Sequence, residues 1–225
     1  MKTVAVLPMK SFGAAKQRLT ETLAPGPRRA LAEAMFSDVL VALRRATSVD
    51  QVLVVTSDHA AEQIGAGYGA LILEEPENGH NDAAARGARR ALEDGAERVL
   101  MVPGDCPLLD PIELGELLVR RVATPSVLIV PDRHGTGTNA LLLTPPDCLM
   151  PSFGPGSCQR HLEAARAAGV AGEVVGVTSL ALDVDTGDDL DTAVESTLSS
   201  SHGGAAHTRG MLAQLRRSRA LTADR

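Results

Sequence analysis

Short apolar runs alternate with segments of helical spacing along most of this chain of 225 residues. Each apolar run has the length of a buried strand, and alternation with helices is typical of an α/β domain built on parallel strands. The length suits one such domain with a substantial core. The expected strands are Thr3–Pro8, Gln51–Thr56, Gly69–Glu74, Arg98–Met101, Ser126–Pro131, Ala140–Leu143 and Glu173–Val177.

The segments between these strands have the spacing and capping residues of helices. In the first of them, apolar residues recur every four positions from Leu31 to Leu43, which indicates a buried helix face. The expected helices are Pro27–Ala46, Ala60–Ile64, Ala83–Leu92, Pro111–Val122, Cys158–Ala168 and a last one ending near Leu198. Their candidate N-caps are Ser57 or Asp58, Asn81 or Asp82, Asp110, Ser157 and Thr186.

One carboxylate, Asp105, is expected at the carboxyl end of the strand Arg98–Met101, where open α/β sheets bind their ligands. Gly104 would let the backbone approach a ligand, and Pro107 prevents the strand from continuing. A lone carboxylate at this place suits Mg²⁺, which takes one or two carboxylates together with substrate phosphates. The alternative is a helix cap, but Asp110 is better placed for that role.

The loop after the first strand concentrates positive charge. Of three lysines in the chain, Lys10 and Lys16 fall in this loop, with Arg18 beside them and Gly13 between them. A glycine-bearing loop with inward cations suits a triphosphate. The loop has neither the GxxxxGK[ST] nor the GxGxxG pattern, so it is not a known phosphate loop of either kind. The alternative is a solvated basic loop.

Two glycine-rich segments in the second half of the chain are candidate anion sites. The first, Gly135-Thr-Gly-Thr-Asn139, offers backbone N–H groups and the hydroxyl of Thr138. The second, Phe153-Gly-Pro-Gly-Ser157, contains Gly154 and opens a helix. A tight hairpin and a capping serine explain them as well. Together they favour a small phosphorylated substrate.

Two further places complete the candidate site. Asp183 and Asp185 alternate on a short extended run, so they share one side of it and could supply a second metal carboxylate. Asn81 lies where a helix of small residues begins, and a nucleotide lying against that helix start is plausible. Close packing of the helix on the sheet explains its alanines equally well.

Composition excludes several classes of protein. The net charge of −6 and the lack of Trp argue against general nucleic-acid binding. No apolar run reaches about 18 residues, so no membrane span is expected. Three cysteines without metal spacing indicate free thiols in a reducing cytoplasm. Cys106 adjoins Asp105, and a small buried residue is the favoured interpretation over a catalytic thiol.

The composition changes to Ser, Gly, Ala and Arg from residue 199 onward. We therefore predict a folded domain over residues 1–198 and a flexible C-terminal tail over residues 199–225. Within the tail, Met211 to Leu221 forms a short basic helix or is disordered. No chemistry is assigned to the tail.

The order of these motifs resembles the 2-phospho-L-lactate guanylyltransferase family (CofC/FbiD type) of deazaflavin coenzyme F-420 biosynthesis. The motifs are the lysine-bearing first loop, Gly-Asp-x-Pro at Asp105, GTGTNALLL, FGPGS and LDVDT, and they cover roughly residues 1–198. The first and last are shared more widely with GT-A-like nucleotidyltransferases. Two departures from the family pattern are His80, where an apolar residue is expected, and Gly187, where proline is usual.

The resemblance implies a mixed, mostly parallel sheet flanked by helices, and GMP transfer from GTP to a phosphorylated three-carbon acid with release of pyrophosphate. By motif, Thr138, Gly154 and Ser157 match positions that bind the acid, and Asp105 matches a Mg²⁺ ligand. Asp183 or Asp185 would be the second ligand. Phosphoenolpyruvate is the favoured acid, with 2-phospho-L-lactate and 3-phospho-D-glycerate as alternatives. Other acceptors, such as a molybdopterin or a sugar phosphate, and a GTP-binding sensor without catalysis are the rival interpretations. The resemblance leaves the oligomeric state open.

Overall fold

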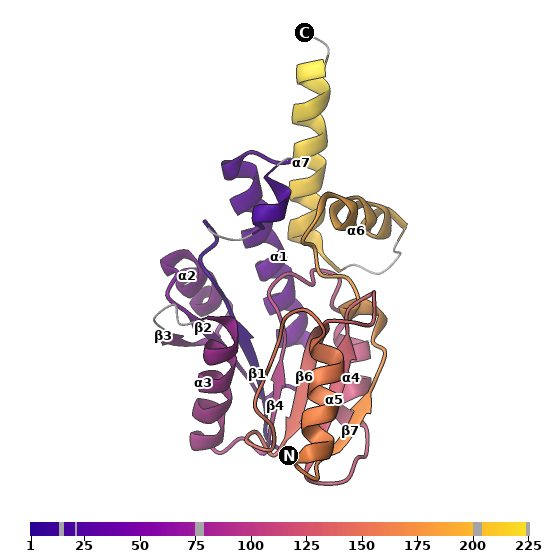
Figure 1. Cartoon of the computed structure of the whole chain (residues 1–225). Helices are drawn as coiled ribbons and strands as arrows, with labels where there is room; N and C mark the ends of the chain where they lie inside the picture. The colour runs from indigo at the N-terminus through magenta and orange to yellow at the C-terminus, as the bar shows by residue number, and fades with distance from the viewer. Residues whose placement is uncertain (14–15, 21, 75–78, 200–203, 224–225) are drawn as a thin grey trace.

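The computed structural model describes residues 1–13, 16–20, 22–74, 79–199 and 204–223, and its centre is a seven-stranded sheet (Figure 1). The strand order is β3-β2-β1-β4-β6-β5-β7. All neighbouring strands are parallel except that β6 runs antiparallel to both β4 and β5. The expected mixed, mostly parallel sheet is confirmed. The strands are β1 Thr3–Pro8, β2 Gln51–Thr56, β3 Leu71–Glu74, β4 Arg98–Met101, β5 Ser126–Pro131, β6 Thr138–Thr144 and β7 Ala171–Val174.

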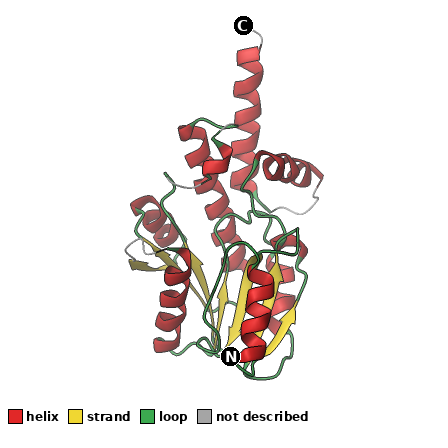
Figure 2. Cartoon of the chain, in the orientation of Figure 1, coloured by secondary structure: helices red, strands yellow, loops and turns green. Residues whose placement is uncertain are grey.

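Helices cover both faces of the sheet (Figure 2). In β1, alternate residues face opposite sides, so that Ala5 and Leu7 pack with α1 while Val4 and Val6 pack with α3. Helices α2 and α4 share the α1 side, and α5 shares the α3 side. The helices are α1 Pro25–Arg45, α2 His59–Gly67, α3 His80–Glu93, α4 Pro111–Val119, α5 Ser157–Ala167, α6 Gly187–Ser199 and α7 Ala206–Ala223, with 3-10 turns η1 Gln17–Leu19 and η2 Thr178–Leu180.

Helix starts show which capping predictions hold. Asp58 accepts hydrogen bonds from the N–H groups of Ala60 and Ala61, and Asp110 caps α4 in the same way, so both of these N-caps are confirmed. The prediction of Ser157 as a cap is wrong, because Gly156 precedes the helix in the left-handed region, with φ of 71°. The capping of α3 by Asn81 or Asp82 is also wrong, because that helix already begins at His80.

Helix α3 approaches the sheet more closely than an ordinary helix could. A Cβ atom added to Gly87 would lie 2.3 Å from Cγ1 of Val6 and 3.0 Å from Cγ2 of Val55. Its neighbours on the buried face are alanines, among them Ala84, Ala88 and Ala91. The small residues of this helix are therefore explained by close packing on β1 and β2.

The C-terminal segment is helical over residues 211–221, which was one of the two alternatives predicted there, and it packs against the domain where a flexible tail was predicted. Residues 206–223 form α7, which lies alongside α1 and continues past it (Figure 1). The buried carboxylate of Asp38 accepts hydrogen bonds from the N–H groups of His207 and Thr208, and Leu212 packs into the core. Asp38 and His207 are 169 residues apart in the chain, so the local composition gives no sign of this cap. Residues 200–203 of the predicted linker and the last two residues lie outside the described residues.

No helix in the described part of the chain is both long enough and apolar enough to cross a membrane.

The close approach of α3 gives a stability prediction. Gly87→Ala should destabilise the protein by about 1–3 kcal/mol, because the added methyl group overlaps Val6 and overpacking a core costs that much. The matched control is Gly115→Ala in α4, where nothing lies within 4 Å of the added Cβ. That change should stabilise by about 0.5–1 kcal/mol through helix propensity. Urea unfolding of the two variants measures both effects, and equal effects would refute the close packing.

Candidate active site

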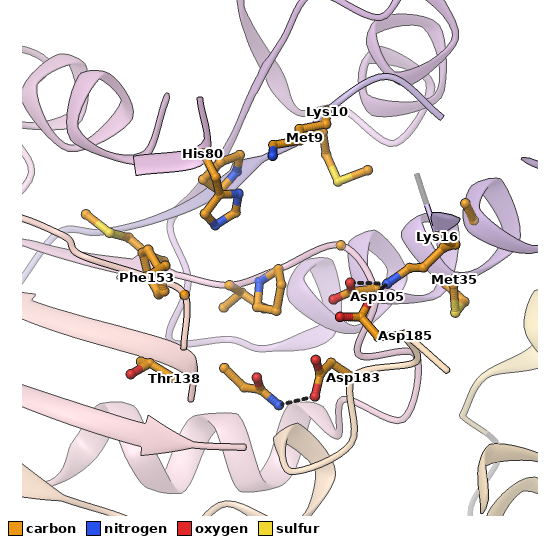
Figure 3. A pocket seen from close by; sticks show the side chains of 18 of the residues that line it. Met9, Lys10, Lys16, Met35, His80, Asp105, Thr138, Phe153, Asp183 and Asp185 are labelled. Atoms are coloured by element: carbon orange, nitrogen blue, oxygen red, sulfur yellow. Dashed lines mark hydrogen bonds and ion pairs between the residues drawn. The ribbon is translucent and has the colours of Figure 1, made fainter. Parts of the chain in front are cut away.

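A cleft of about 660 Å³ opens at the edge of the sheet where β1 and β4 end and the antiparallel β6 begins. Its lining residues come from loops far apart in the chain, and Figure 3 shows their side chains converging. Lys10 and Lys16 follow β1, Asp105 follows β4, and Asp183 and Asp185 precede α6. The wall is also lined by His80, Asn81, Thr138, Asn139, Phe153 and Gly154.

Lys16 lies between two of the acidic residues. Its Nζ forms an ion pair with Oδ2 of Asp105 and lies 2.7 Å from Oδ1 of Asp185. The lysine side chain is only 6% exposed. Burial alone would lower the pKa of Lys16, but the charges of Asp105 and Asp185 outweigh it and raise that pKa above its usual value. Lys16 is therefore cationic throughout the neutral pH range.

The acidic residues have capacity for a further cation. Oδ1 of Asp105 is buried and has no hydrogen-bond partner among the described residues. Burial raises the pKa of Asp183, and the nearby Asp105 carboxylate raises it further. An unpartnered buried carboxylate oxygen costs free energy, which a cation would recover. No group of three metal-ligating side chains forms a ready-made site within the described residues. These carboxylates thus fit Mg²⁺ that takes its other ligands from substrate and water.

Backbone contacts hold the acidic loops in place. The N–H of Val184 donates to the carbonyl oxygen of Asp105, at 3.1 Å. Nδ2 of Asn139 donates to the carbonyl oxygen of Leu180, at 2.8 Å, and to Oδ1 of Asp183, at 3.2 Å. Asn139 therefore fixes the segment that carries Asp183 to β6, and Val184 fixes the same segment to the loop that carries Asp105.

Further contacts fix the ends of this segment and the loop after β1. Asp189 accepts hydrogen bonds from the N–H groups of Asp185 and Thr186, and it is paired with Arg133. Asp58, besides capping α2, accepts a hydrogen bond from the N–H of Phe12. The site is thus assembled by side chains that pair with backbone groups of neighbouring loops.

Gly104 lines the cleft, and it also has a role in the packing of the loops. A Cβ atom at this position would lie 2.3 Å from Sδ of Met9 and 3.0 Å from Cδ2 of Phe36. The glycine lets the loops after β1 and β4 pack against each other. The two charged groups that they carry, Lys16 and Asp105, come within ion-pair distance for this reason.

Two aromatic rings, those of His80 and Phe153, line the cleft, and the buried ring of His161 packs against Phe153. His80, Phe153 and His161 stack edge to face, with ring centroids 5.3 and 5.4 Å apart. Asn81 fixes Phe153, because its Oδ1 accepts from the Phe153 N–H at 2.7 Å and its Nδ2 donates to the Phe153 carbonyl. Burial lowers the pKa of His80, so its ring lies in the cleft in the neutral form at neutral pH.

The hydroxyl groups of the two glycine-rich segments meet behind this wall. Oγ of Ser157 lies 3.0 Å from Oγ1 of Thr138, which lies 3.1 Å from Nδ1 of His161. Nε2 of His161 accepts a hydrogen bond from the N–H of Ser152 at 2.9 Å. Burial, with a contribution from the charge of Arg160, lowers the pKa of His161 to about 4. The ring is therefore neutral at neutral pH.

The structure brings most of the predicted site residues together, but not all. Lys10, Lys16, Asn81, Asp105, Thr138, Gly154, Asp183 and Asp185 line the cleft. Arg18 and Gly13 are exposed and are not among its lining residues, and residues 14–15 between them lie outside the described residues. Ser157 is fully buried behind Thr138, so its hydroxyl does not face the cleft.

The supporting roles of Asn139 and His161 were not predicted, although Asn139 ends the first glycine-rich segment and His161 lies four residues after the second. Arg160 and His161 lie near the start of α5, where basic residues suggest charges that bind an anion. Arg160 instead donates to the carbonyl oxygens of Ser152 and Pro155, and so braces the loop before α5. The buried Cys106 has its thiol pKa raised well above the usual value by burial. A catalytic thiol is therefore disfavoured.

The position of Lys16 gives a prediction for the folded protein without substrate. Lys16→Met should lower stability by about 1–3 kcal/mol, because it leaves the Asp105 carboxylate without its partner. The partial exposure of Asp185, at 45% of its side chain, keeps the cost below that of a fully buried ion pair. Addition of Mg²⁺ should raise the melting temperature of this variant more than that of the wild type, since the metal replaces the lost charge.

The matched control is Lys10→Met, because Lys10 lines the same cleft but is exposed. This change should alter stability by no more than about 0.5 kcal/mol. Equal melting temperatures for the two variants, or no effect of Mg²⁺ on Lys16→Met, would contradict the central place of Lys16.

The buried His161 predicts a pH dependence of stability. Its pKa is about 4 when folded, against 6.5 as the ordinary value, so the unfolded chain binds a proton that the folded chain does not. The contribution of the neutral ring to the stability of the protein is therefore full above about pH 6.5, and it is lost as the pH falls towards 4. His161→Gln should lose less stability than the wild type between pH 7 and pH 5, as measured by thermal unfolding. Parallel losses would show that His161 is not buried in the neutral form.

Curated relatives of this chain share one type of activity. A phosphoenolpyruvate guanylyltransferase of Conexibacter woesei is 56% identical over 219 residues, which cover 96% of this chain and 98% of that protein. A 3-phospho-D-glycerate guanylyltransferase of Colwellia psychrerythraea is 36% identical over 85% of this chain and 90% of its own length. A 2-phospho-L-lactate guanylyltransferase of Methanothermobacter thermautotrophicus is 34% identical over 96% of this chain and 92% of its own length.

Solved structures with low sequence identity share the fold. A protein of Desulfovibrio desulfuricans G20 described as a nucleotide-diphospho-sugar transferase matches with a TM-score of 0.77 and 18% identity over 100% of this chain and 98% of its own. A nucleotidyl transferase from Methanothermobacter matches with a TM-score of 0.64 and 20% identity, over 88% and 98% of the two chains. The family model "Guanylyl transferase CofC like" matches residues 3–221. The chain therefore belongs to the family of CofC-like guanylyl transferases.

Proposed function

We propose that the protein transfers GMP from GTP to the phosphate of phosphoenolpyruvate and releases pyrophosphate, as a step in deazaflavin coenzyme F-420 biosynthesis. The observation that carries the proposal is that lysines, carboxylates, Thr138 and Gly154 all line one cleft. Such a cleft has room for two anionic substrates side by side. The choice of phosphoenolpyruvate follows the name of the relative that is 56% identical. The acids named for other relatives, 2-phospho-L-lactate and 3-phospho-D-glycerate, are the alternatives.

The proposed nucleophile is an oxygen of the acceptor's phosphate, which attacks the α-phosphorus of GTP. The second pKa of a phosphate monoester is about 6, so the group is mostly dianionic at neutral pH. The reaction needs no general base for this reason. Its barrier is the repulsion between two anions, which fixed positive charge lowers.

We assign different residues of the cleft to binding the nucleotide, the metal ion and the acceptor. Lys10 and Lys16 would bind the triphosphate of GTP, and Asn81 would support the nucleotide through the start of α3. Asp105, with Asp183 or Asp185, would hold Mg²⁺, which supplies charge neutralisation on the phosphates when it is bound. Thr138 and Gly154 would bind the acceptor. Ser157 would act through Thr138, since its own hydroxyl is buried.

Pyrophosphate release with GTP and Mg²⁺ tests this function, in separate reactions with each of the three acids. Release with phosphoenolpyruvate, and none with ATP in place of GTP, is the expected result. Release with another of the acids would correct the acceptor. No release with any acid, despite saturable GTP binding, would contradict transfer to these acids and favour another acceptor or a GTP-binding sensor.

Substitution of Asp105 tests its assignment to the metal site. Asp105→Asn should lower turnover by about 100-fold, since this is the scale of losing one electrostatic element in an active site. Asp110→Asn is the control, because that carboxylate caps α4 and does not line the cleft. It should keep normal turnover. Near-normal turnover of a folded Asp105→Asn protein would refute the assignment.

A further inference from the structure

The imidazole of His161 is fully buried and both of its nitrogens have a partner. The N–H of Ser152 points at Nε2, at 2.9 Å, and Oγ1 of Thr138 lies 3.1 Å from Nδ1. A backbone N–H can only donate, so Nε2 must accept and carries no proton. The proton of the neutral ring is therefore on Nδ1, which donates to Thr138.

The charged form of the ring is unfavourable in this arrangement. An imidazolium carries a proton on each nitrogen, and the Nε2 proton would oppose the N–H of Ser152. The lowered pKa of His161, caused by burial and by the charge of Arg160, agrees with this geometry. His161 is therefore in the neutral form, with its proton on Nδ1.

This tautomer decides which hydroxyl proton is available to a ligand. Thr138 and Ser157 carry one hydroxyl proton each, and the hydrogen bond between them uses one. His161 donates to Thr138 and so uses a lone pair of that hydroxyl, leaving the second proton unused. Ser157 is fully buried whereas Thr138 lines the cleft, so Ser157 donates to Thr138, and the Thr138 proton is directed to the cleft. With the opposite tautomer, Thr138 would donate to Nδ1 and no hydroxyl proton would be left.

We propose that His161 is a positioning residue that orients the Thr138 hydroxyl as a hydrogen-bond donor to an anionic oxygen of the acceptor. The inference rests on the proposed function, because it takes the acceptor to bind at Thr138. The lone pairs of this hydroxyl are occupied by His161 and Ser157, so it recognises an acceptor atom and not a donor. A phosphate or carboxylate oxygen meets that requirement, and a neutral hydroxyl or amino group at the same place meets it less well.

The first test is the tautomer itself, which needs no turnover. Long-range proton–nitrogen correlation in ¹⁵N-labelled protein at neutral pH distinguishes a protonated ring nitrogen from an unprotonated one. The signals of His161 are assigned as those that move in Thr138→Val, where the partner of Nδ1 is lost. The expected result is a protonated Nδ1 and an unprotonated Nε2. A protonated Nε2, or a charged ring, would overturn the proposal.

The second test compares two variants that each keep one half of the imidazole's contacts. Asn at position 161 places an amide nitrogen near the position of Nδ1 and can still donate to Thr138. Gln places its amide near the position of Nε2 and keeps only the contact with Ser152. His161→Gln should weaken phosphoenolpyruvate binding about 10-fold, as expected for one hydrogen bond to a charged group, whereas His161→Asn should keep most of the affinity.

Dissociation constants from NMR titration give this comparison without catalysis, and the dissociation constant for GTP is the internal control. Both variants should bind GTP as the wild type does. If His161 had only a structural role, its substitution would weaken the binding of both ligands. Thr138→Val should also weaken phosphoenolpyruvate binding about 10-fold. Adding His161→Gln to this variant should weaken the binding no further. If His161→Gln fails to fold, His161→Asn decides, because an affinity for phosphoenolpyruvate as low as that of Thr138→Val would overturn the role of Nδ1.

The outcomes separate this proposal from the proposed function. Wild-type protein that binds phosphoenolpyruvate but releases no pyrophosphate would contradict the transferase and leave the role of His161 supported. Equal affinities of His161→Gln and the wild type would overturn the role of His161 while the transferase stands. Absence of binding by any of the three acids to the wild type would overturn both.

Discussion

The ion pairs of Lys16 with Asp105 and Asp185 are the interaction on which the site depends. They join three loops, since Lys16 is 89 residues from Asp105 and 169 residues from Asp185. The lysine is almost fully buried, so its charge is stable only because the carboxylates are there. The close approach of the loops at Gly104 permits the contact. In turn, Asn139 and the backbone of Val184 fix Asp183 beside Asp105.

The cleft is suited to chemistry driven by charge and not by proton transfer. Lys16 lies between acidic groups of the cleft, and the rings of His80 and Phe153 also line it, with the buried His161 stacked on Phe153. Both histidines have lowered pKa values because they are buried, so neither ring adds a positive charge at neutral pH. The one thiol beside the site, Cys106, is buried and has a raised pKa. These features agree with a transfer reaction in which a phosphate acceptor is already ionised.

Much of the fold could be predicted because its signals are local. The strands β1, β2, β4 and β5 are continuous apolar runs, and Asp58 and Asp110 cap helices through bonds to residues two and three positions ahead. Predictions that needed partners far along the chain were less successful. The position of α7 depends on Asp38, and the role of His161 depends on Thr138, 23 residues away. Ser157 was mistaken for a cap because a left-handed Gly156 cannot be distinguished from an ordinary loop glycine in the sequence.

Attack by the acceptor's phosphate on GTP is tested most directly by the fate of isotope-labelled phosphate oxygens. Phosphoenolpyruvate with ¹⁸O in every terminal phosphate oxygen is incubated with GTP, Mg²⁺ and the protein, and the products are followed by ³¹P NMR and mass spectrometry. Attack by the acceptor's phosphate would place ¹⁸O in the oxygen that bridges the two phosphorus atoms of the product, and none in the released pyrophosphate. A product in which the acceptor's phosphate is still a monoester, joined to GMP through its carboxylate, would contradict attack by the phosphate.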